Sequence, residues 1–472
     1  MNRDETPSAL RALPSVDSLL RTDVALSLVD LVGRQQLTSL ARAVTEEMRA
    51  TLQEARATSE NGDRSREALL AEAAIRLERA CLQEASLGLR HVINASGVIL
   101  HTNLGRAPLS NAAIRAVSND AARYSTLEYE TETGRRGRRG ARVEELLKQL
   151  TGAESAMVVN NCAAAVLLVL SVIARDGETI ISRGELVEIG GDFRVPDVMA
   201  QSGTKLVEVG ATNRTRLADY ERAITDQTAL VMRVHPSNFR IVGFTQVPTL
   251  EQLADVAHSK EIWLYEDAGS GVLVDLSEYG IRDEPIISQS IAAGADIISF
   301  SGDKLLGSAQ AGLIVGRAEL IERLRRAPLY RALRADKLAL AALEATLQSY
   351  VRGTYLDEVP ALRMLAISHQ QLEERARDFL AHHSSKKTSD ALGLEILEGR
   401  SAIGGGAAPT THPRTTLIAL THRTLGVEAL ESALRKSFPP VIARIADDKV
   451  LLDLRTVMED EVEELSRILL SL

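Results

Sequence analysis

Cysteine is scarce in this chain of 472 residues, which has only Cys81 and Cys162. Two thiols are too few for a disulfide framework and lack the spacing of a metal site, so we expect a protein of the reducing cytoplasm that holds no metal. Long apolar runs are also missing, because no stretch of ~18 uncharged apolar residues occurs. The opening MNRDETPSAL carries acids where an export signal would be apolar. We therefore expect neither export nor a membrane span.

Aromatic residues make up only 3% of the chain, and the formal net charge is -9. The first value argues against a surface that reads bases by stacking, and the second against a nucleic-acid partner attracted by overall charge. Any RNA contact must then depend on a local basic patch. The remaining composition is ordinary for a globular protein, with 45% apolar and 25% charged residues. The length allows roughly three domains and a sizeable core.

The first part of the chain has the period of amphipathic helices. Between residues 37 and 55, apolar side chains recur at three- and four-residue steps, namely Leu40, Ala41, Val44, Met48 and Leu52. A second helical stretch, roughly 64–87, follows the turn-like SENGD. We assign residues 1–85 to a small helical domain, and it contains no obvious catalytic cluster.

Residues 86–340 change to short β-branched runs that alternate with helical segments. These runs are SAMVVN, ETIISR, TKLVEVG, ALVMRVH, EIWLYED, ADIISF and AGLIVG. The alternation predicts a catalytic α/β domain around a mostly parallel sheet. Residues 341–472 contain long helices, a glycine-rich break GGGAAP, and then strands and helices. They predict a C-terminal α+β domain, and we expect the break to concern that domain alone.

An acid and a lysine follow two successive strand-like runs. Asp267 ends EIWLYED, and Lys304 lies 37 residues later, after ADIISF. Ligands of α/β sheets gather at the carboxyl ends of strands, so both side chains can face one pocket. Pyridoxal phosphate requires this pair, because the lysine forms a Schiff base and the carboxylate keeps the ring nitrogen protonated. Each residue alone is weak evidence, since a lysine at a strand end more often only reaches solvent.

A third element, NNCAAAV at 160–166, joins the strand SAMVV to a helix of small residues. Amides of Asn161, Cys162 and Ala163 at a helix N-terminus would suit the phosphate of the cofactor. The plainer interpretation is a helix cap by Asn160 or Asn161, which is compatible with phosphate binding. The order of phosphate loop, acid and lysine is that of fold-type I pyridoxal-phosphate enzymes.

Nine longer stretches are far more specific than any of these motifs. They are LPSVDSLL at 13–20, INASGVILHTNLGRAPLS at 93–110, LEYETETGRRG at 127–137, SRGELVEIGGDFRVPDVM at 182–199, VEVGATNRTRLADY at 207–220, HPSNFRIVGFT at 235–245, SGDKLLGSAQAGLIVG at 301–316, LYRALRADK at 329–337 and the tail PPVIARIADDKVLLDLRTV. In these stretches the chain resembles bacterial selenocysteine synthases, the L-seryl-tRNA(Sec) selenium transferases. The resemblance implies a fold-type I large domain with a mostly parallel seven-stranded sheet between helices.

The resemblance further implies a β-replacement on serine that is esterified to tRNA(Sec). Loss of the β-hydroxyl would give an aminoacrylate, and selenium from selenophosphate would add to it. The implied catalytic residues are Lys304 and Asp267, and the implied pyridoxal-phosphate ligands are Asn161, Cys162, Ala163, Asp267, Ser301 and Lys304. Guanidinium groups suit oxyanions, and the implied selenophosphate ligands are Arg106, Arg331 and Arg334, which have no acidic neighbour in the sequence.

Partners also follow from the resemblance. It implies that the N-terminal helical domain grips the tRNA and that the active protein is a homo-oligomer, at least a dimer and in the family a ring of dimers such as a decamer. The densest basic run, GRRGRRGAR at 134–142, has two interpretations that we rate evenly. It can contact a phosphate backbone, or it can be a solvated loop or meet an acidic neighbouring subunit.

Two rival functions remain open at this point. A related pyridoxal-phosphate lyase or synthase, acting on a free amino acid or an amino sugar phosphate, would use the same Lys304 and Asp267. A noncatalytic tRNA-binding protein could keep the fold without the chemistry, although retention of lysine, acid and arginines argues against it. The chain also departs from the family, which commonly has a third asparagine at the position of Cys162 and GGPQAG where this chain has GSAQAG.

Overall fold

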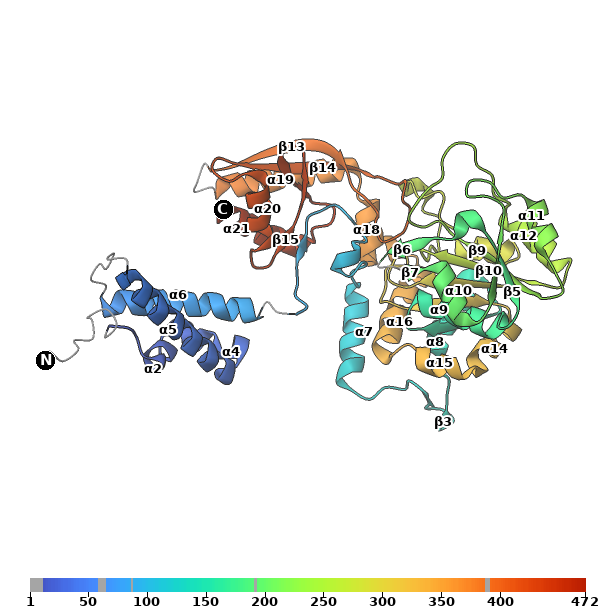
Figure 1. Ribbon diagram of the computed structural model, residues 1–472, viewed down its shortest axis with the longest axis horizontal. Helices are drawn as coiled ribbons and strands as arrows, with labels where there is room; N and C mark the ends of the chain where they lie inside the picture. The colour runs from blue at the N-terminus through green and yellow to red at the C-terminus, as the bar shows by residue number, and fades with distance from the viewer. Residues whose placement is uncertain (1–11, 58–64, 86–87, 191–192, 387–390) are drawn as a thin grey trace. The chain divides into compact units, whose positions relative to one another are not determined.

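The computed structural model describes residues 12–57, 65–85, 88–190, 193–386 and 391–472 (Figure 1). The chain divides into two compact units, Met1–His91 and Val92–Leu472. No helix in the described part of the chain is long and apolar enough to cross a membrane.

The first unit consists of helices around a small apolar core. Its two long helices carry most of that core, with Ala41, Val44 and Met48 on one and Leu77 and Cys81 on the other. The helix period predicted in residues 37–55 is thus present, and three of the five residues that showed it are buried. The helices are α2 (Val16–Leu20), α3 (Asp23–Ser27), α4 (Val29–Val32), α5 (Arg34–Ala57) and α6 (Arg66–Ala85).

Seven strands of the described second unit form one sheet in the order β4-β12-β11-β10-β9-β5-β8. Strand β12 runs antiparallel to both of its neighbours, whereas the pairs from β11 across to β8 are parallel. The predicted mostly parallel seven-stranded sheet is therefore confirmed. The strands are β4 (Ser155–Val159), β5 (Glu178–Ser182), β8 (Lys205–Val209), β9 (Thr228–Val234), β10 (Trp263–Gly269), β11 (Ile297–Ser301) and β12 (Gly312–Gly316).

Helices cover both faces of this sheet because strand side chains alternate between its two sides. Ile297 packs in a cluster with α9, α10 and α14, whereas its neighbour Ile298 packs in the cluster that contains α8 and α16. Figure 1 shows the same layering. The helices are α7 (Asn111–Ala122), α8 (Ala141–Thr151), α9 (Cys162–Ile173), α10 (Val195–Ser202), α11 (Leu217–Ala223), α12 (Leu250–His258), α13 (Ile287–Ala292), α14 (Ala318–Arg326), α15 (Pro328–Leu333), α16 (Lys337–Arg352), α17 (Tyr355–Glu358) and α18 (Pro360–Ala366).

A smaller antiparallel sheet follows in the order β13-β14-β17-β16. Residues near the start of the second unit join these C-terminal strands: Ile93 pairs in parallel with Val441, and Val98 bridges to Ala402. The segment 93–98, expected within the 86–340 domain, thus pairs with C-terminal residues. The elements are β1 (Ile93–Asn94), α19 (His369–Ser385), β13 (Leu392–Arg400), β14 (Arg414–His422), α20 (Val427–Arg435), β15 (Val441–Ile442), β16 (Arg444–Ala446), β17 (Lys449–Asp453) and α21 (Val462–Leu470).

A buried arginine fixes the loop that runs from the small sheet toward the large one. Arg455 is 1% exposed and donates to the main-chain oxygens of Met364 and Arg414. Its Nε also donates to the hydroxyl of Ser401, which in turn donates to Asp453. Because these bonds satisfy a charge that is costly to bury, they hold residue 401 in place at the start of the glycine-rich loop.

Candidate active site

The carboxyl ends of three strands meet at one cavity of about 480 Å³. Asp267 lies near the end of β10, Ser301 ends β11, and Lys304 follows in the turn after it. Helix α9 begins just after β4 at the same edge of the sheet. Seven of the nine residues assigned from the sequence line this cavity: Arg106, Asn161, Cys162, Ala163, Asp267, Ser301 and Lys304.

Lys304 is a buried amine, with 4% of its surface exposed. Its Nζ donates a hydrogen bond to the main-chain oxygen of Gly406 at 3.3 Å. Gly406 belongs to the GGGAAP break, in which Gly404, Gly405 and Gly406 all adopt left-handed φ angles of 77°, 65° and 66°. The expectation that this break concerns the C-terminal domain alone is wrong, because it brings a carbonyl to the lysine of the large sheet.

Asp267 is the buried carboxylate of the cavity, 6% exposed. Its Oδ1 accepts hydrogen bonds from the Ser299 hydroxyl at 3.1 Å and from the Cys162 thiol at 3.5 Å. Burial raises the pKa of Asp267 above its ordinary value, while the positive charge of Lys304 acts in the opposite direction. A cation close to Asp267 would favour its ionised form further, and the cavity offers a place for one.

The N-terminus of α9 faces the same cavity through Cys162 and Ala163. The Asn161 side chain caps this helix by accepting from the Ala164 N–H at 2.8 Å, so the capping interpretation is correct. Helix geometry leaves the N–H groups of Cys162 and Ala163 without partners inside the helix. A Cβ at Gly312 would lie 2.1 Å from the Asn161 oxygen, so only glycine lets β12 pass this close.

The three assigned arginines do not share one environment. Arg106 lines the cavity, has a left-handed φ of 61°, and pairs with Asp303 at 2.7 Å. Arg331, on α15, is exposed, and neither it nor Arg334 lines the cavity. Arg334 pairs with Glu128 at 3.2 Å, and its backbone bridges to Val159 at the end of β4. Arg106 and Arg334 thus have acidic partners in the folded chain, although neither has an acidic residue next to it in the sequence.

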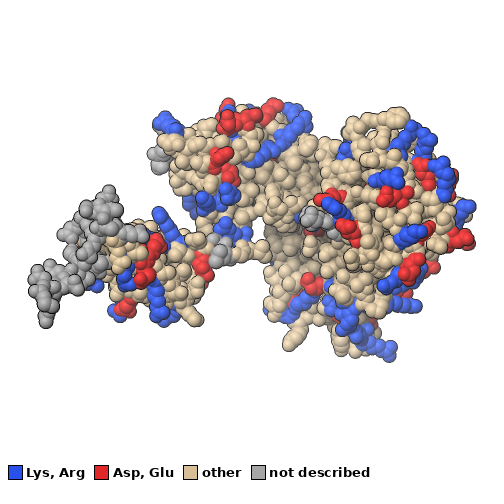
Figure 2. Space-filling model, in the orientation of Figure 1, with Lys and Arg blue, Asp and Glu red and all other residues tan. Residues whose placement is uncertain are grey.

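Glu128 connects Arg334 to the basic run. It also accepts from Arg139 at 2.8 Å and from Arg136 at 2.6 Å, and these hydrogen bonds lower the pKa of its carboxyl. Short strands β2 (Tyr129–Glu130) and β3 (Arg135–Arg136) form the hairpin of this run. Basic side chains gather at the end of the larger unit where β3 lies (Figures 1 and 2). Glu128 is thus one carboxylate shared by three arginines.

Several cavity residues were missed by the sequence interpretation, namely Thr102, Asn103, Val166, Ile189, Gly190, Gly269, Asp303 and Gln310. Asp303 directly precedes Lys304 in the sequence. Thr102 and Asn103 lie within residues 93–110, one of the stretches that resemble selenocysteine synthases, and could have been assigned to the site from that stretch. Ser299 is a different case, because it acts on Asp267 from within a buried strand and lacks any motif.

Comparison with known proteins decides the family. The model for L-seryl-tRNA selenium transferase matches residues 92–458, and the model for the selenocysteine synthase N terminal matches residues 10–56. The chain belongs to the L-seryl-tRNA selenium transferase family. A transferase of this family from Alkaliphilus metalliredigens is 45% identical over 96% of each chain. Another, from Moorella thermoacetica, is 46% identical over 98% of this chain and 97% of its own length.

A solved structure shares the fold of this L-seryl-tRNA selenium transferase family member. The structure of D-glucosaminate-6-phosphate ammonia-lyase superposes with a TM-score of 0.57 and 21% identity, over 82% of this chain and 96% of the lyase. This likeness confirms the predicted α/β fold and says nothing further. The much higher identity to the selenium transferases favours the transferase over the lyase alternative.

Proposed function

We propose that this chain converts L-seryl-tRNA(Sec) to L-selenocysteinyl-tRNA(Sec), with pyridoxal phosphate as cofactor and selenophosphate as selenium donor. One observation carries the proposal: relatives named for this transfer match 96% to 98% of the chain. The geometry agrees with it, because Lys304 and Asp267 line a single cavity. We place the reaction in the cytoplasm, where the two free cysteines would stay reduced.

The residues of the cavity fit pyridoxal phosphate. A buried amine, a buried carboxylate and two free N–H groups at the start of α9 match its aldehyde, its ring nitrogen and its phosphate. A Cβ at Gly406 would lie 3.6 Å from the lysine Nζ, so glycine keeps this position open. When bound, the cofactor supplies an electron sink for the charge that develops at the α-carbon of an amino acid.

Lys304 has two tasks in this proposal. Its Nζ would hold the cofactor through the aldehyde group while no substrate is bound. The freed Nζ would then take the α-proton of the seryl group and supply a proton to the departing β-hydroxyl. The carbonyl of Gly406, which accepts from Nζ at 3.3 Å, would hold the freed amine inside the cavity.

Asp267 would pair with the protonated ring nitrogen, and its neighbours would orient it. Ser299 and Cys162 both donate to Oδ1. Burial and the negative charge of Asp267 raise the pKa of the Cys162 thiol. The thiol therefore stays protonated and acts as a donor to Asp267 rather than as a nucleophile.

Selenophosphate would bind through Arg106, Arg331 and Arg334. Arg106 lines the cavity, while Arg334 is fixed beside the end of β4, one residue before Asn160. The active form in this proposal is a homo-oligomer of at least two chains, because Arg331 and Arg334 lie outside the cavity of their own chain. Sedimentation of the purified holoprotein tests this, and a monomer that retains full turnover would contradict it.

We propose that residues 1–85, which make up most of the first unit, bind the tRNA. Its apolar core is separate from those of the second unit. Deletion of residues 1–85 should therefore abolish binding of tRNA(Sec) in a filter assay while uptake of pyridoxal phosphate stays unchanged. Equal tRNA binding by the shortened chain would contradict this assignment.

Turnover of defined substrates tests the function itself. Holoprotein incubated with seryl-tRNA(Sec) and selenophosphate should yield selenocysteinyl-tRNA(Sec), and Lys304→Ala should yield none. Equally efficient turnover of free serine or of an amino sugar phosphate would favour the lyase alternative instead.

A further inference from the structure

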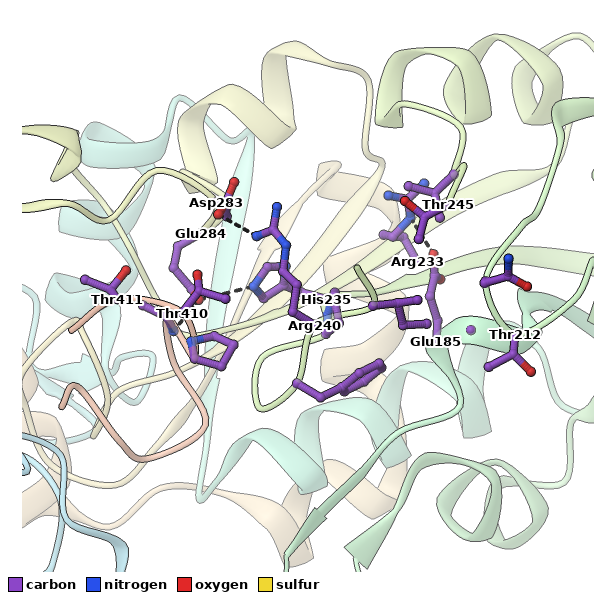
Figure 3. A pocket seen from close by; sticks show the side chains of 18 residues that line it. Glu185, Thr212, Arg233, His235, Arg240, Thr245, Asp283, Glu284, Thr410 and Thr411 are labelled. Atoms are coloured by element: carbon purple, nitrogen blue, oxygen red, sulfur yellow. Dashed lines mark hydrogen bonds and ion pairs between the residues drawn. The ribbon is translucent and has the colours of Figure 1, made fainter. Parts of the chain in front are cut away.

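A second cavity, of about 320 Å³, lies at the same edge of the sheet. Its lining comes from β9, from residues that follow β5, β8, β9 and β10, and from residues 408–411. Figure 3 shows Thr410 and Thr411 at one end of the cavity and Thr212 and Thr245 at the other. Open α/β sheets bind ligands at this edge, and neither the cofactor nor the selenium donor is assigned to this cavity.

The second cavity adjoins the one that holds Lys304. The main-chain N–H of His235 donates to the main-chain oxygen of Asp267 at 3.0 Å, and His235 lines the second cavity. On the other side, Gly406 accepts from Lys304, and Ala408 lines the second cavity two residues later. Ser237 lies at the junction, because its Oγ would be 3.6 Å from a Cβ at Gly406. Ser237, Gly406 and Ala408, which lie at this junction, are small and uncharged.

The walls of the second cavity contain buried polar atoms that have no hydrogen-bond partner in the described chain. Oε2 of Glu284 is one of these. Nε2 of His235 and Nε of Arg233 also lack a hydrogen bond, but each lies near a carboxylate oxygen, 3.3 Å from Glu284 and 3.1 Å from Glu185 respectively. Glu284 is 7% exposed, and its Oε1 accepts from the Ala408 N–H at 2.5 Å and lies 3.3 Å from His235. A buried oxygen without a partner, such as Oε2 of Glu284, is uncommon in protein cores, and at a cavity it indicates a missing partner.

Charge decides which class of ligand suits this cavity. Glu185, Asp283 and Glu284 line it together with two guanidinium groups, and Arg240 is already paired with Asp283 at 2.5 Å. An oxyanion would bind weakly here, because the three carboxylates offset the positive charge of the two guanidinium groups. An uncharged heteroaromatic group with hydroxyls fits better, because the carboxylates accept from an exocyclic amine and the rim threonines bond to hydroxyls. Phe239, which also lines the cavity, adds an aromatic surface.

We infer that the second cavity binds the 3′-terminal nucleoside of the acylated RNA. This inference rests on the proposed function: when the seryl group lies at Lys304, its ester places the terminal ribose immediately beside that cavity. The second cavity presents three kinds of group to the terminal adenosine: carboxylates that accept hydrogen bonds, threonine hydroxyls and the ring of Phe239. The small, uncharged residues Ser237 and Gly406 leave room for the uncharged ester that joins the seryl group to the ribose.

The experiment uses the holoprotein and two stable probes, serinamide and an adenosine that carries serine as a 3′-amide. Each is titrated against the visible absorbance of the bound cofactor. We expect the nucleoside probe to bind at least tenfold more tightly than serinamide. Thr410→Trp and Thr245→Trp, which fill the cavity from opposite ends, should each abolish this advantage, whereas Thr424→Trp, an exposed threonine outside both cavities, should keep it.

Two results would overturn the inference. Equal affinity of the two probes for the unsubstituted protein would remove it while leaving the proposed function intact. An advantage that survives in both filled variants would remove it as well. A holoprotein whose absorbance responds to neither probe would instead overturn the proposed function, and the nucleoside site would fall with it.

Discussion

The amine of Lys304 donates to the main-chain oxygen of Gly406, 3.3 Å away and 102 residues further along the chain. This bond connects the turn after β11 with the loop that leaves the small sheet. Two of the three left-handed glycines of that loop, Gly404 and Gly405, lie against Val98 and Leu100, which added Cβ atoms would approach to 2.5 and 2.8 Å. The position of the small sheet is thus linked directly to the lysine.

Gly406→Ala tests this link. Alanine at a left-handed φ costs roughly 1 to 2 kcal/mol, and its Cβ would lie 3.6 Å from Nζ. We expect cofactor affinity, measured from the visible absorbance, to fall about tenfold. Gly353→Ala is the matched control, because Gly353 has a φ of 75° and no atom within 4 Å of an added Cβ. A loss of equal size in both variants would show that backbone strain, and not contact with Lys304, is responsible.

Asp267→Asn removes the charge and keeps the shape. Ser299 can still donate to the amide oxygen, so we expect the variant to fold and to take up the cofactor. Turnover should fall by at least ~100-fold, because the ring nitrogen loses its anionic partner. Single-turnover rates would measure the loss, and mass spectrometry after borohydride would verify the bond to Lys304. Asp226→Asn, an exposed acid, should behave as the unsubstituted protein.

Some residues of this site could be predicted from the sequence, and others could not. Asp267 and Lys304 could be predicted because strand ends are local features and parallel strands bring them to one edge. Gly406 could not, because it acts through a main-chain oxygen and has no side-chain signal. Arg334 pairs with Glu128, which lies 206 positions away in the sequence. The charges next to Arg334 in the sequence therefore could not predict this pair.

Arg334→Ala tests the donor site. The remaining pairs of Glu128 with Arg136 and Arg139 should keep the local fold intact. A charge-assisted hydrogen bond contributes roughly 1.5 to 3 kcal/mol, so half-saturation by selenophosphate should need at least tenfold more donor. Arg331→Ala should act in the same direction, and the two effects should be coupled. Arg326→Ala, an exposed arginine on α14 paired with Glu322, is the control. Unchanged donor saturation in both variants would remove the two residues from the donor site.

Glu185 makes stability depend on pH. Burial raises its pKa to about 7, against the opposing charge of Arg233, and Glu266 and His235 also act on it. The folded protein therefore holds a proton that the unfolded chain releases near its ordinary value of 4.5. Between these two values the unfolded state binds fewer protons, so the contribution of Glu185 to stability falls as pH rises, by at most about 3 kcal/mol, and is constant above pH 7.

Glu185→Gln isolates this dependence, because the glutamine oxygen can still accept from the Val234 N–H, as Oε2 does at 3.1 Å. Denaturant unfolding of both proteins from pH 5 to pH 8 should give a difference in unfolding free energy that changes in favour of glutamine as pH rises toward 7. Above pH 7 the difference should stay level, since both states of the unsubstituted chain are then ionised at this position. A difference that is constant across the whole range would mean that Glu185 keeps its ordinary pKa when folded, and that Arg233 outweighs burial in the wall of the second cavity.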